Sequence, residues 1–319
     1  MNDRKPSIVF MGTPAFAVAS LRALHEEGYT IAAVVTAPDK PAGRGQKISF
    51  TPVKEYAIGN GLPLFQPEKL RDASFINSIR ELNADMFVVV AFRMLPELVW
   101  SMPPMGTFNL HASLLPQYRG AAPINHAIIN GETQTGVTTF LIDEQIDTGK
   151  ILLRKATDIL PEDNAGTLHD RLMTLGADLV KETVSGLANK TLKPHPQIAE
   201  PGTILHEAPR IFPPDTFVDW NDTALRIHNK IRGLSPYPGA VTSLVSDKRT
   251  IRLKLYESRI TDDTLHPIPG KIMAGEKSKL VITCGSGAVE IVTLQPEGRK
   301  KMTSQEFLRG YDLKGCCLA

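Results

Sequence analysis

The sequence predicts an α/β fold, in which a Rossmann-like, open and mostly parallel sheet with helices on both faces is followed by a small, OB-like β-barrel. Three observations lead to this prediction. Short apolar runs alternate with segments of helical spacing in the first part of the chain. One run, Met86–Val90, is apolar throughout, as expected of a strand buried on both faces. Short strand-like runs with Gly and Pro turns then dominate the last part.

The elements of the first part follow one another in a regular order. The strands we expect are short apolar runs at residues 8–11, 31–35, 86–90 and 107–110. The helices we expect have apolar residues three and four positions apart, at residues 15–27, 72–82, 122–130 and 167–187. Gly28 follows the first helix and marks its end.

The composition changes after the last of these helices. Pro and Gly are dense between residues 193 and 214, as is typical of a linker. Beyond it we expect two short helices, at residues 222–232 and 303–309. Between them we expect four strands, at residues 240–245, 250–257, 279–283 and 288–294. The sequence therefore predicts a first domain at 1–192, a linker at 193–208 and a barrel domain at 209–319.

Composition and charge exclude several classes of protein. Hydrophobic residues make up 42% of the 319 residues and charged residues 22%, as in ordinary globular chains. No apolar run is long enough to span a bilayer, no signal peptide is evident, and three cysteines cannot form a disulfide framework. We expect a cytoplasmic monomer. Residues 206–319 hold 17 basic and 13 acidic residues, net +4, which fits either a polyanionic partner or a solvated surface.

Candidate chemistry lies in loops that follow the expected strands, because open parallel sheets bind ligands at the carboxyl ends of their strands. Gly12-Thr13-Pro14 lacks the dinucleotide fingerprint, which disfavours a dehydrogenase. Asn109 and His111 are two apart, so both side chains point to one side and could donate to one oxyanion. Asp147 in the acidic loop 143–149 could orient the histidine. A capping Asn, a structural His and a plain turn are the alternatives.

Together, these motifs resemble the formyltransferases that use 10-formyltetrahydrofolate. The matching motifs are Gly12-Thr13-Pro14, Asn109-x-His111-x-Ser113-Leu114-Leu115-Pro116 and Asp147-Thr148-Gly149. The resemblance implies that Asn109, His111 and Asp147 are catalytic. It also implies that the folate is bordered by two segments, represented by Ser113, Leu114, Leu115 and Pro116 and by Arg93 and Leu95. It implies no metal, and no His/Cys spacing for one is present.

Over nearly its whole length the chain resembles the methionyl-tRNA formyltransferases, one branch of that family. The stretches 38–47, 231–240 and 294–302 carry this resemblance, whereas glycinamide ribonucleotide formyltransferases have no counterpart to residues 206–319. It implies transfer of a formyl group from 10-formyltetrahydrofolate to the α-amino group of methionyl initiator tRNA, for translation initiation. The expected tRNA-binding residues are Lys40, Arg44, Lys47, Arg232, Arg299, Lys300 and Lys301. Trp220 and Tyr237 could stack on RNA.

The chain also departs from this family at two places. Pro213-Pro214 lies where a Lys followed by acidic residues is common, and Lys150 replaces a usually acidic residue. Two other functions stay open: formylation of a sugar-nucleotide or another small amine, and RNA binding without catalysis. Cys316-Cys317-Leu318-Ala319 formally fits a prenylation box, but no polybasic run adjoins it and we expect no prenylation.

Overall fold

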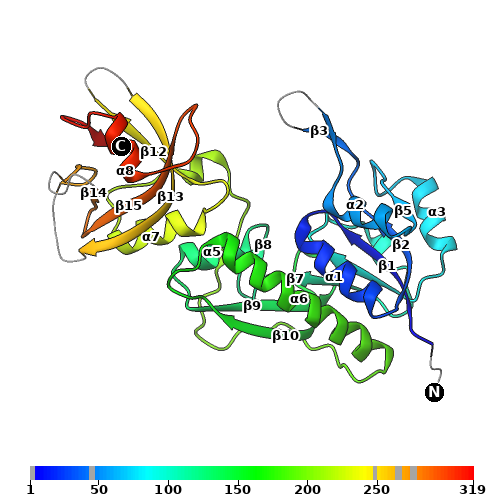
Figure 1. Cartoon of the computed structure of the whole chain (residues 1–319). Coiled ribbons are helices and arrows are strands. Elements are labelled where there is room, and N and C mark those ends of the chain that lie inside the picture. The colour runs from blue at the N-terminus through cyan, green and yellow to red at the C-terminus, as the bar shows by residue number, and fades with distance from the viewer. Residues whose placement is uncertain (1–3, 43–46, 247–249, 263–267, 274–278) are drawn as a thin grey trace. The chain divides into compact units, whose positions relative to one another are not determined.

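The computed structural model describes residues 4–42, 47–246, 250–262, 268–273 and 279–319. Contacts divide the chain into two compact units (Figure 1). The first comprises Met1–Gly120, Thr135–Thr157 and His169–Glu207. The second comprises Ala121–Gln134, Asp158–Leu168 and Ala208–Ala319. Neither unit is one continuous stretch of sequence, because two short segments, Ala121–Gln134 and Asp158–Leu168, interrupt the first unit and belong to the second.

The first unit contains a seven-stranded sheet with the strand order β10-β9-β7-β6-β1-β2-β5. These strands are β1 Ser7–Gly12, β2 Thr30–Val35, β5 Leu64–Phe65, β6 Met86–Val90, β7 Thr107–His111, β9 Gln134–Leu141 and β10 Ile151–Asp158. Five of them are joined by parallel pairings, from β5 through β2, β1 and β6 to β7. The predicted open and mostly parallel sheet is confirmed. We did not predict β9 and β10; β9 pairs with β7 in the antiparallel sense.

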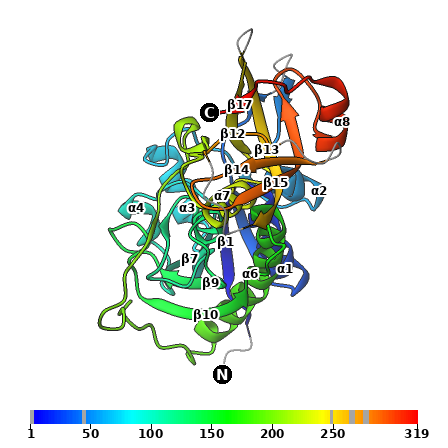
Figure 2. The same ribbon diagram turned by 90° about the vertical axis from the view of Figure 1, so that its left-hand side faces the viewer.

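Helices cover both faces of this sheet. They are α1 Ala15–Glu26, α2 Pro52–Gly59, α3 Ala73–Glu81, α4 Glu97–Trp100 and α6 Ala165–Ala188. Figure 2 shows α1 and α6 on one side of the sheet and α3 and α4 on the other. On the α3 side, Phe75 and Ile79 pack with Val9 and Val89. On the α6 side, Leu110 of β7 lies against Gly176. No helix in the described parts of the chain is long and apolar enough to cross a bilayer.

The second unit contains an antiparallel sheet that is nearly closed into a barrel, with the order β14-β15-β13-β12-β17 and β16 paired to β15. Its strands are β12 Ala240–Val245, β13 Thr250–Asp262, β14 Leu280–Thr283, β15 Ala288–Pro296, β16 Met302–Thr303 and β17 Cys317–Leu318. Lys271 forms an isolated β-bridge with Cys317 of β17, and Ile272 forms one with Ile282 of β14. Residues 271 and 272 therefore connect the two edge strands, β14 and β17. The predicted β-barrel is confirmed.

Short helices complete the second unit: α5 Pro123–Ile129, the 3-10 helix η1 Pro213–Thr216, α7 Ala224–Gly233 and α8 Ser304–Gly310. The two prolines that depart from the family pattern begin η1. Trp220 is only 4% exposed, packs in the core of the barrel and donates from Nε1 to Thr242 Oγ1 at 2.9 Å. The expectation that Trp220 stacks on RNA is therefore wrong, whereas Tyr237 is 81% exposed.

Candidate active site

The three predicted catalytic residues converge on one face of the sheet. Asn109 and His111 are paired with Phe140 and Thr138 of β9, so all four side chains share the face opposite α6. The loop between β9 and β10 returns over this face and brings Asp147 Oδ2 to 3.7 Å from His111 Nδ1. The site therefore lies over β7 rather than only at the end of the strand.

A tight turn determines the backbone conformation of the 143–149 loop. Asp143 Oδ1 accepts hydrogen bonds from the Gln145 amide at 3.2 Å and from the Thr148 hydroxyl at 2.8 Å. Asp147 has a φ of +56°, in the left-handed region that Asp tolerates better than most residues. A Cβ on Gly149 would lie 1.6 Å from the Leu141 carbonyl oxygen, so only glycine fits there. The predicted turn at this loop thus also positions Asp147.

The hydrogen bonds of His111 assign its two ring nitrogens. Nε2 lies 2.8 Å from the carbonyl oxygen of Tyr118, which can only accept, so Nε2 must carry a proton. Nδ1 is the nitrogen that faces the Asp147 carboxylate. A second proton on the ring would therefore sit on Nδ1, next to a negative charge. The His111 side chain is buried.

Asn109 and Asp147 retain unused hydrogen-bonding atoms. Asn109 is half-buried, and no described residue forms a hydrogen bond with its side-chain amide. One oxygen of Asp147, Oδ2, accepts from the Gly120 amide at 3.0 Å. The other oxygen, Oδ1, has no hydrogen-bond partner among the described residues. An amide donor on the strand face that carries His111 and a carboxylate acceptor beside His111 thus remain available.

The predicted folate-bordering residues Ser113 to Pro116 are buried to different degrees. Ser113 and Leu115 have no exposed surface. The Ser113 hydroxyl donates to the Gln117 carbonyl oxygen at 2.5 Å, and Leu115 packs with Phe140 and Ile151. Leu114 and Pro116 are half-buried. Of these four side chains, only Leu114 and Pro116 have surface with which to contact a ligand.

The other predicted folate-bordering segment follows β6. The Arg93 guanidinium donates to the carbonyl oxygens of Glu68, at 2.8 Å, and Pro67. Burial lowers the pKa of Arg93 from its ordinary value. Leu95 is buried and packs with Val99 of α4. Arg93 therefore ties the loop after β6 to the loop after β5, and Leu95 anchors it in the core.

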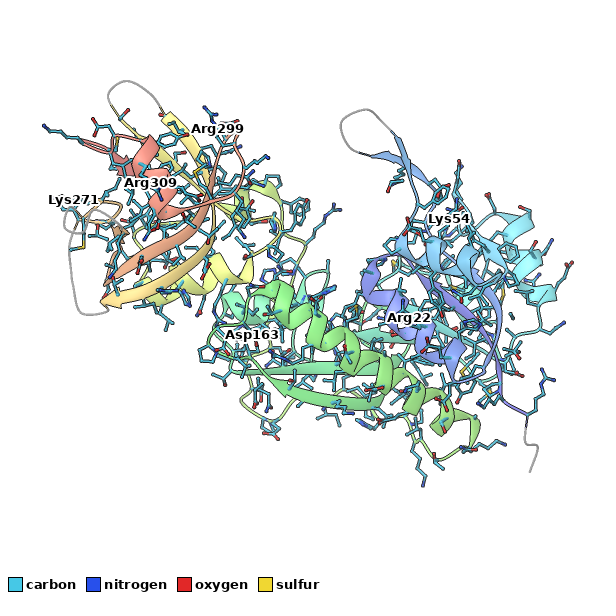
Figure 3. The ribbon with its side chains drawn as sticks, in the orientation of Figure 1. Arg22, Lys54, Asp163, Lys271, Arg299 and Arg309 are labelled. Carbon is cyan, nitrogen blue, oxygen red and sulfur yellow. The ribbon has the colours of Figure 1, made fainter. Side chains whose placement is uncertain are left out.

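The basic loop predicted to bind tRNA begins at an antiparallel hairpin of β3 Lys40–Ala42 and β4 Lys47–Ser49. Lys40 is exposed on β3, Arg44 lies outside the described residues, and Lys47 lies on β4. Lys54 of α2, shown in Figure 3, forms an ion pair with Asp39 beside the first strand of the hairpin. Hydrogen bonds from Lys54, and then from Gln66, lower the pKa of Asp39.

The four cations predicted in the second unit have different surroundings. Arg299, which Figure 3 labels, Lys300 and Lys301 are exposed in the turn between β15 and β16. Lys301 Nζ lies 4.6 Å from the centre of the Tyr256 ring. Arg232 differs, because its guanidinium donates to Asn229 Oδ1 at 2.9 Å and to the Asp163 carbonyl oxygen at 3.1 Å. Arg232 therefore has hydrogen-bond partners within the protein, which the sequence pattern did not reveal.

Two features of the site have no signal in local sequence. The Tyr118 carbonyl holds His111, and Tyr118 itself has a φ of +58°. Gln197, in the predicted linker, donates to the backbone on both sides of Thr148.

The described residues contain no group of three or more His, Cys, Asp or Glu side chains arranged to hold a metal ion.

Comparison with known proteins identifies families and relatives that this chain resembles. Residues 5–184 match the formyl transferase family and residues 210–312 match the formyl transferase C-terminal domain. A methionyl-tRNA formyltransferase of Bacteroides thetaiotaomicron is 49% identical over 310 residues, covering 96% of both chains. One from Flavobacterium johnsoniae is 47% identical over 306 residues, again covering 96% of both chains.

Solved structures share the fold at lower sequence identity. The sugar 3N-formyl transferase WlaRD is 20% identical, with a TM-score of 0.65 over 93% of this chain and 100% of its own. HypX from Aquifex aeolicus, solved with tetrahydrofolic acid, is 18% identical, with a TM-score of 0.62 over 96% of this chain and 47% of its own. Family matches on both parts of the chain and near-half identity over almost its whole length confirm the resemblance read from the motifs. The chain belongs to the formyl transferase family, on its methionyl-tRNA formyltransferase branch.

Proposed function

We propose that this chain transfers the formyl group of 10-formyltetrahydrofolate to the α-amino group of methionyl initiator tRNA, in the cytoplasm and for translation initiation. The observation that carries this proposal is the near-half identity to methionyl-tRNA formyltransferases, which extends through the C-terminal domain. The arrangement of Asn109, His111 and Asp147 over β7 supports it. In the reaction, the amine nitrogen bonds to the formyl carbon and the bond from that carbon to N10 of the folate breaks. The amine loses a proton and N10 gains one.

Asn109 and His111 stabilise the charge that develops on the formyl oxygen. The side-chain amide of Asn109 is free to donate, so it gains a partner in the transition state without losing one. His111 can donate only from Nδ1, because Nε2 is held by the Tyr118 carbonyl. A hydrogen bond from His111 to the oxyanion would therefore use Nδ1, the nitrogen that faces Asp147.

Asp147 accepts the proton from the attacking amine. Oδ2 is held by the Gly120 amide at 3.0 Å and faces His111, whereas Oδ1 is free. A free carboxylate oxygen within reach of the amine, directly or through one water molecule, is what a general base needs. The two oxygens of one carboxylate thus have separate roles: Oδ2 orients and supports the imidazolium, and Oδ1 takes the proton.

The folate lies against the segments that follow β6 and β7. Leu114 and Pro116 supply half-buried apolar surface, while Ser113 and Leu115 shape the turn from inside. Arg93 and Leu95 hold the loop after β6 against the core. Polar recognition of the folate ring therefore falls mainly to backbone groups of these two segments.

The tRNA is bound by cations from both parts of the chain. Lys40 in the 38–54 loop and Arg299, Lys300 and Lys301 in the β15–β16 turn are exposed, as phosphate contacts require. Arg44 and Lys47 belong to the same basic loop. Arg232 contributes indirectly, by fixing the loop that contains Asp163.

We assign catalysis to a domain at residues 1–192, the linker between the domains to residues 193–208 and tRNA binding to a domain at residues 209–319. We also infer that the protein acts as a monomer.

A direct assay tests this function. Purified protein is incubated with 10-formyltetrahydrofolate and, in parallel, with charged initiator methionyl-tRNA, a charged elongator tRNA or an amino-sugar nucleotide. We expect the formyl group on the initiator methionyl-tRNA. Labelling of the sugar alone would instead make the chain a small-amine formyltransferase. Binding of tRNA without turnover on any acceptor would make it an RNA-binding protein.

A further inference from the structure

The segment from His195 to Glu207 is held along the first unit by hydrogen bonds. His195 exchanges two backbone hydrogen bonds with Ile151 of β10, at 2.8 and 3.0 Å. The Gln117 side chain accepts from the His206 amide at 2.9 Å, and the Tyr118 amide donates to the His206 carbonyl oxygen at 2.7 Å. A segment whose composition predicts a linker is therefore attached to the turn that holds His111.

Gln197 makes four hydrogen bonds from this segment. Its Nε2 donates to the carbonyl oxygens of Asp147 and Gly149, both at 2.9 Å. Its Oε1 accepts from Nε and Nη2 of Arg119, at 3.1 and 2.7 Å. Carbonyl oxygens can only accept and a guanidinium can only donate, so these partners fix which end of the amide is nitrogen. Both donors and both lone pairs of the amide are used.

These bonds close a ring of contacts around the candidate base. Gln197 ties the backbone of Asp147 to the side chain of Arg119, and the carboxylate of Asp147 accepts from the amide of Gly120, the next residue along. Asp147 has a left-handed φ, and the bonds to the carbonyl oxygens before and after Thr148 restrain rotation of those peptide units. The carboxylate is thus fixed both through its own backbone and through its Oδ2.

We propose that Gln197 is a positioning residue for formyl transfer, which holds Asp147 at the distance from His111 and the attacking amine that proton transfer needs. This inference rests on the proposed function, because Gln197 acts through Asp147. Its amide is fully occupied by Arg119 and the loop, so it orients the base rather than binding either substrate. A misplacement of about 1 Å in a reacting group costs on the order of a hundredfold in rate.

Two substitutions remove the donors of the Gln197 amide in different ways. Gln197→Glu keeps an acceptor for Arg119 but removes both donors and sets a carboxylate against two carbonyl oxygens. Gln197→Met keeps the length and removes every hydrogen bond. We expect kcat to fall about tenfold to a hundredfold in both variants, with KM for tRNA and for the folate within threefold of the wild type. Glu200→Ala, an exposed change in the same segment, serves as the matched control and should leave kcat unchanged.

A double-mutant cycle distinguishes positioning from a general structural effect. Single-turnover rates are measured for Gln197→Glu and Gln197→Met alone and in an Asp147→Asn background, with far-UV circular dichroism to check folding. If Gln197 acts through Asp147, its substitution adds little once the carboxylate is gone. An equal loss in both backgrounds, or kcat within twofold of the wild type in both single variants, would overturn the inference. An inactive wild type would instead refute the proposed function.

Discussion

Asn109→Ala is the substitution that most cleanly separates catalysis from folding in this site. The side chains of Ser113, Thr138 and Asp147 form hydrogen bonds within the protein, so their removal would disturb the fold as well as the chemistry. The Asn109 amide has no hydrogen-bond partner among the described residues and is half-buried. Its removal leaves no buried donor or acceptor unsatisfied, and Ala fits the strand position opposite Phe140.

The magnitude follows from the role of the amide. A donor that bonds only the developing oxyanion stabilises the transition state and not the resting protein, so its loss lowers kcat. Removal of one such donor typically costs about 2.7–4 kcal/mol, or a factor of 10²–10³ in kcat. We expect this loss in Asn109→Ala, with KM for both substrates within threefold and the melting temperature within about 2 °C of the wild type. Steady-state formylation of charged initiator tRNA and thermal unfolding measure these quantities.

Asn109→Asp provides a second, sharper comparison. It has the same size and places a carboxylate where the amide donated, so repulsion of the oxyanion adds to the lost hydrogen bond. We expect it to be less active than Asn109→Ala. Activity of Asn109→Ala within threefold of the wild type, or Asn109→Asp as active as Asn109→Ala, would refute the assignment of Asn109 to the oxyanion.

Three further outcomes follow from the geometry. Burial lowers the pKa of His228 from 6.5, so as pH falls the unfolded chain takes up a proton before the folded chain does, and the free energy of unfolding decreases below about pH 6.5 by up to about 1.4 kcal/mol per pH unit. In thermal melts between pH 7.5 and 5.5, the melting temperature of His228→Asn should depend less on pH than that of the wild type. An equal pH dependence in the two proteins would contradict this prediction. Gly149→Ala drives a Cβ into the Leu141 carbonyl oxygen and should lower kcat more than tenfold, whereas wild-type kinetics would show that the loop has room. Arg232→Ala leaves the buried Asn229 oxygen without its donor and should cost about 1–3 kcal/mol in urea unfolding; a loss of tRNA affinity at full stability would make Arg232 an RNA contact instead.

Local pattern predicts the central elements of this fold better than the two strands at one end of its sheet. The apolar run at 8–11 and the helical spacing at 15–27 correspond closely to β1 and α1, because burial on two faces or on one face leaves a direct trace in residue order. The strands β9 and β10 escaped prediction. β10 alternates buried and exposed residues and ends the sheet as an edge strand, so it lacks the uniform apolar run that identifies the central strands.

The candidate site shows the same limit at the level of side chains. Period two along β7 predicts that Asn109 and His111 share a face, and the structure bears this out because the rule is local. Gln197 and Arg119 are 78 positions apart, and neither periodicity nor composition in their surroundings indicates that they meet. The density of Pro and Gly at 193–214 predicts a linker, and the backbone there is mostly irregular apart from Glu207–Ala208 and the start of η1. Irregular backbone can also follow an active-site loop and satisfy its carbonyl oxygens. The sequence therefore reveals the Pro- and Gly-rich character of this segment, whereas only the folded chain reveals its hydrogen bond to the Asp147 backbone.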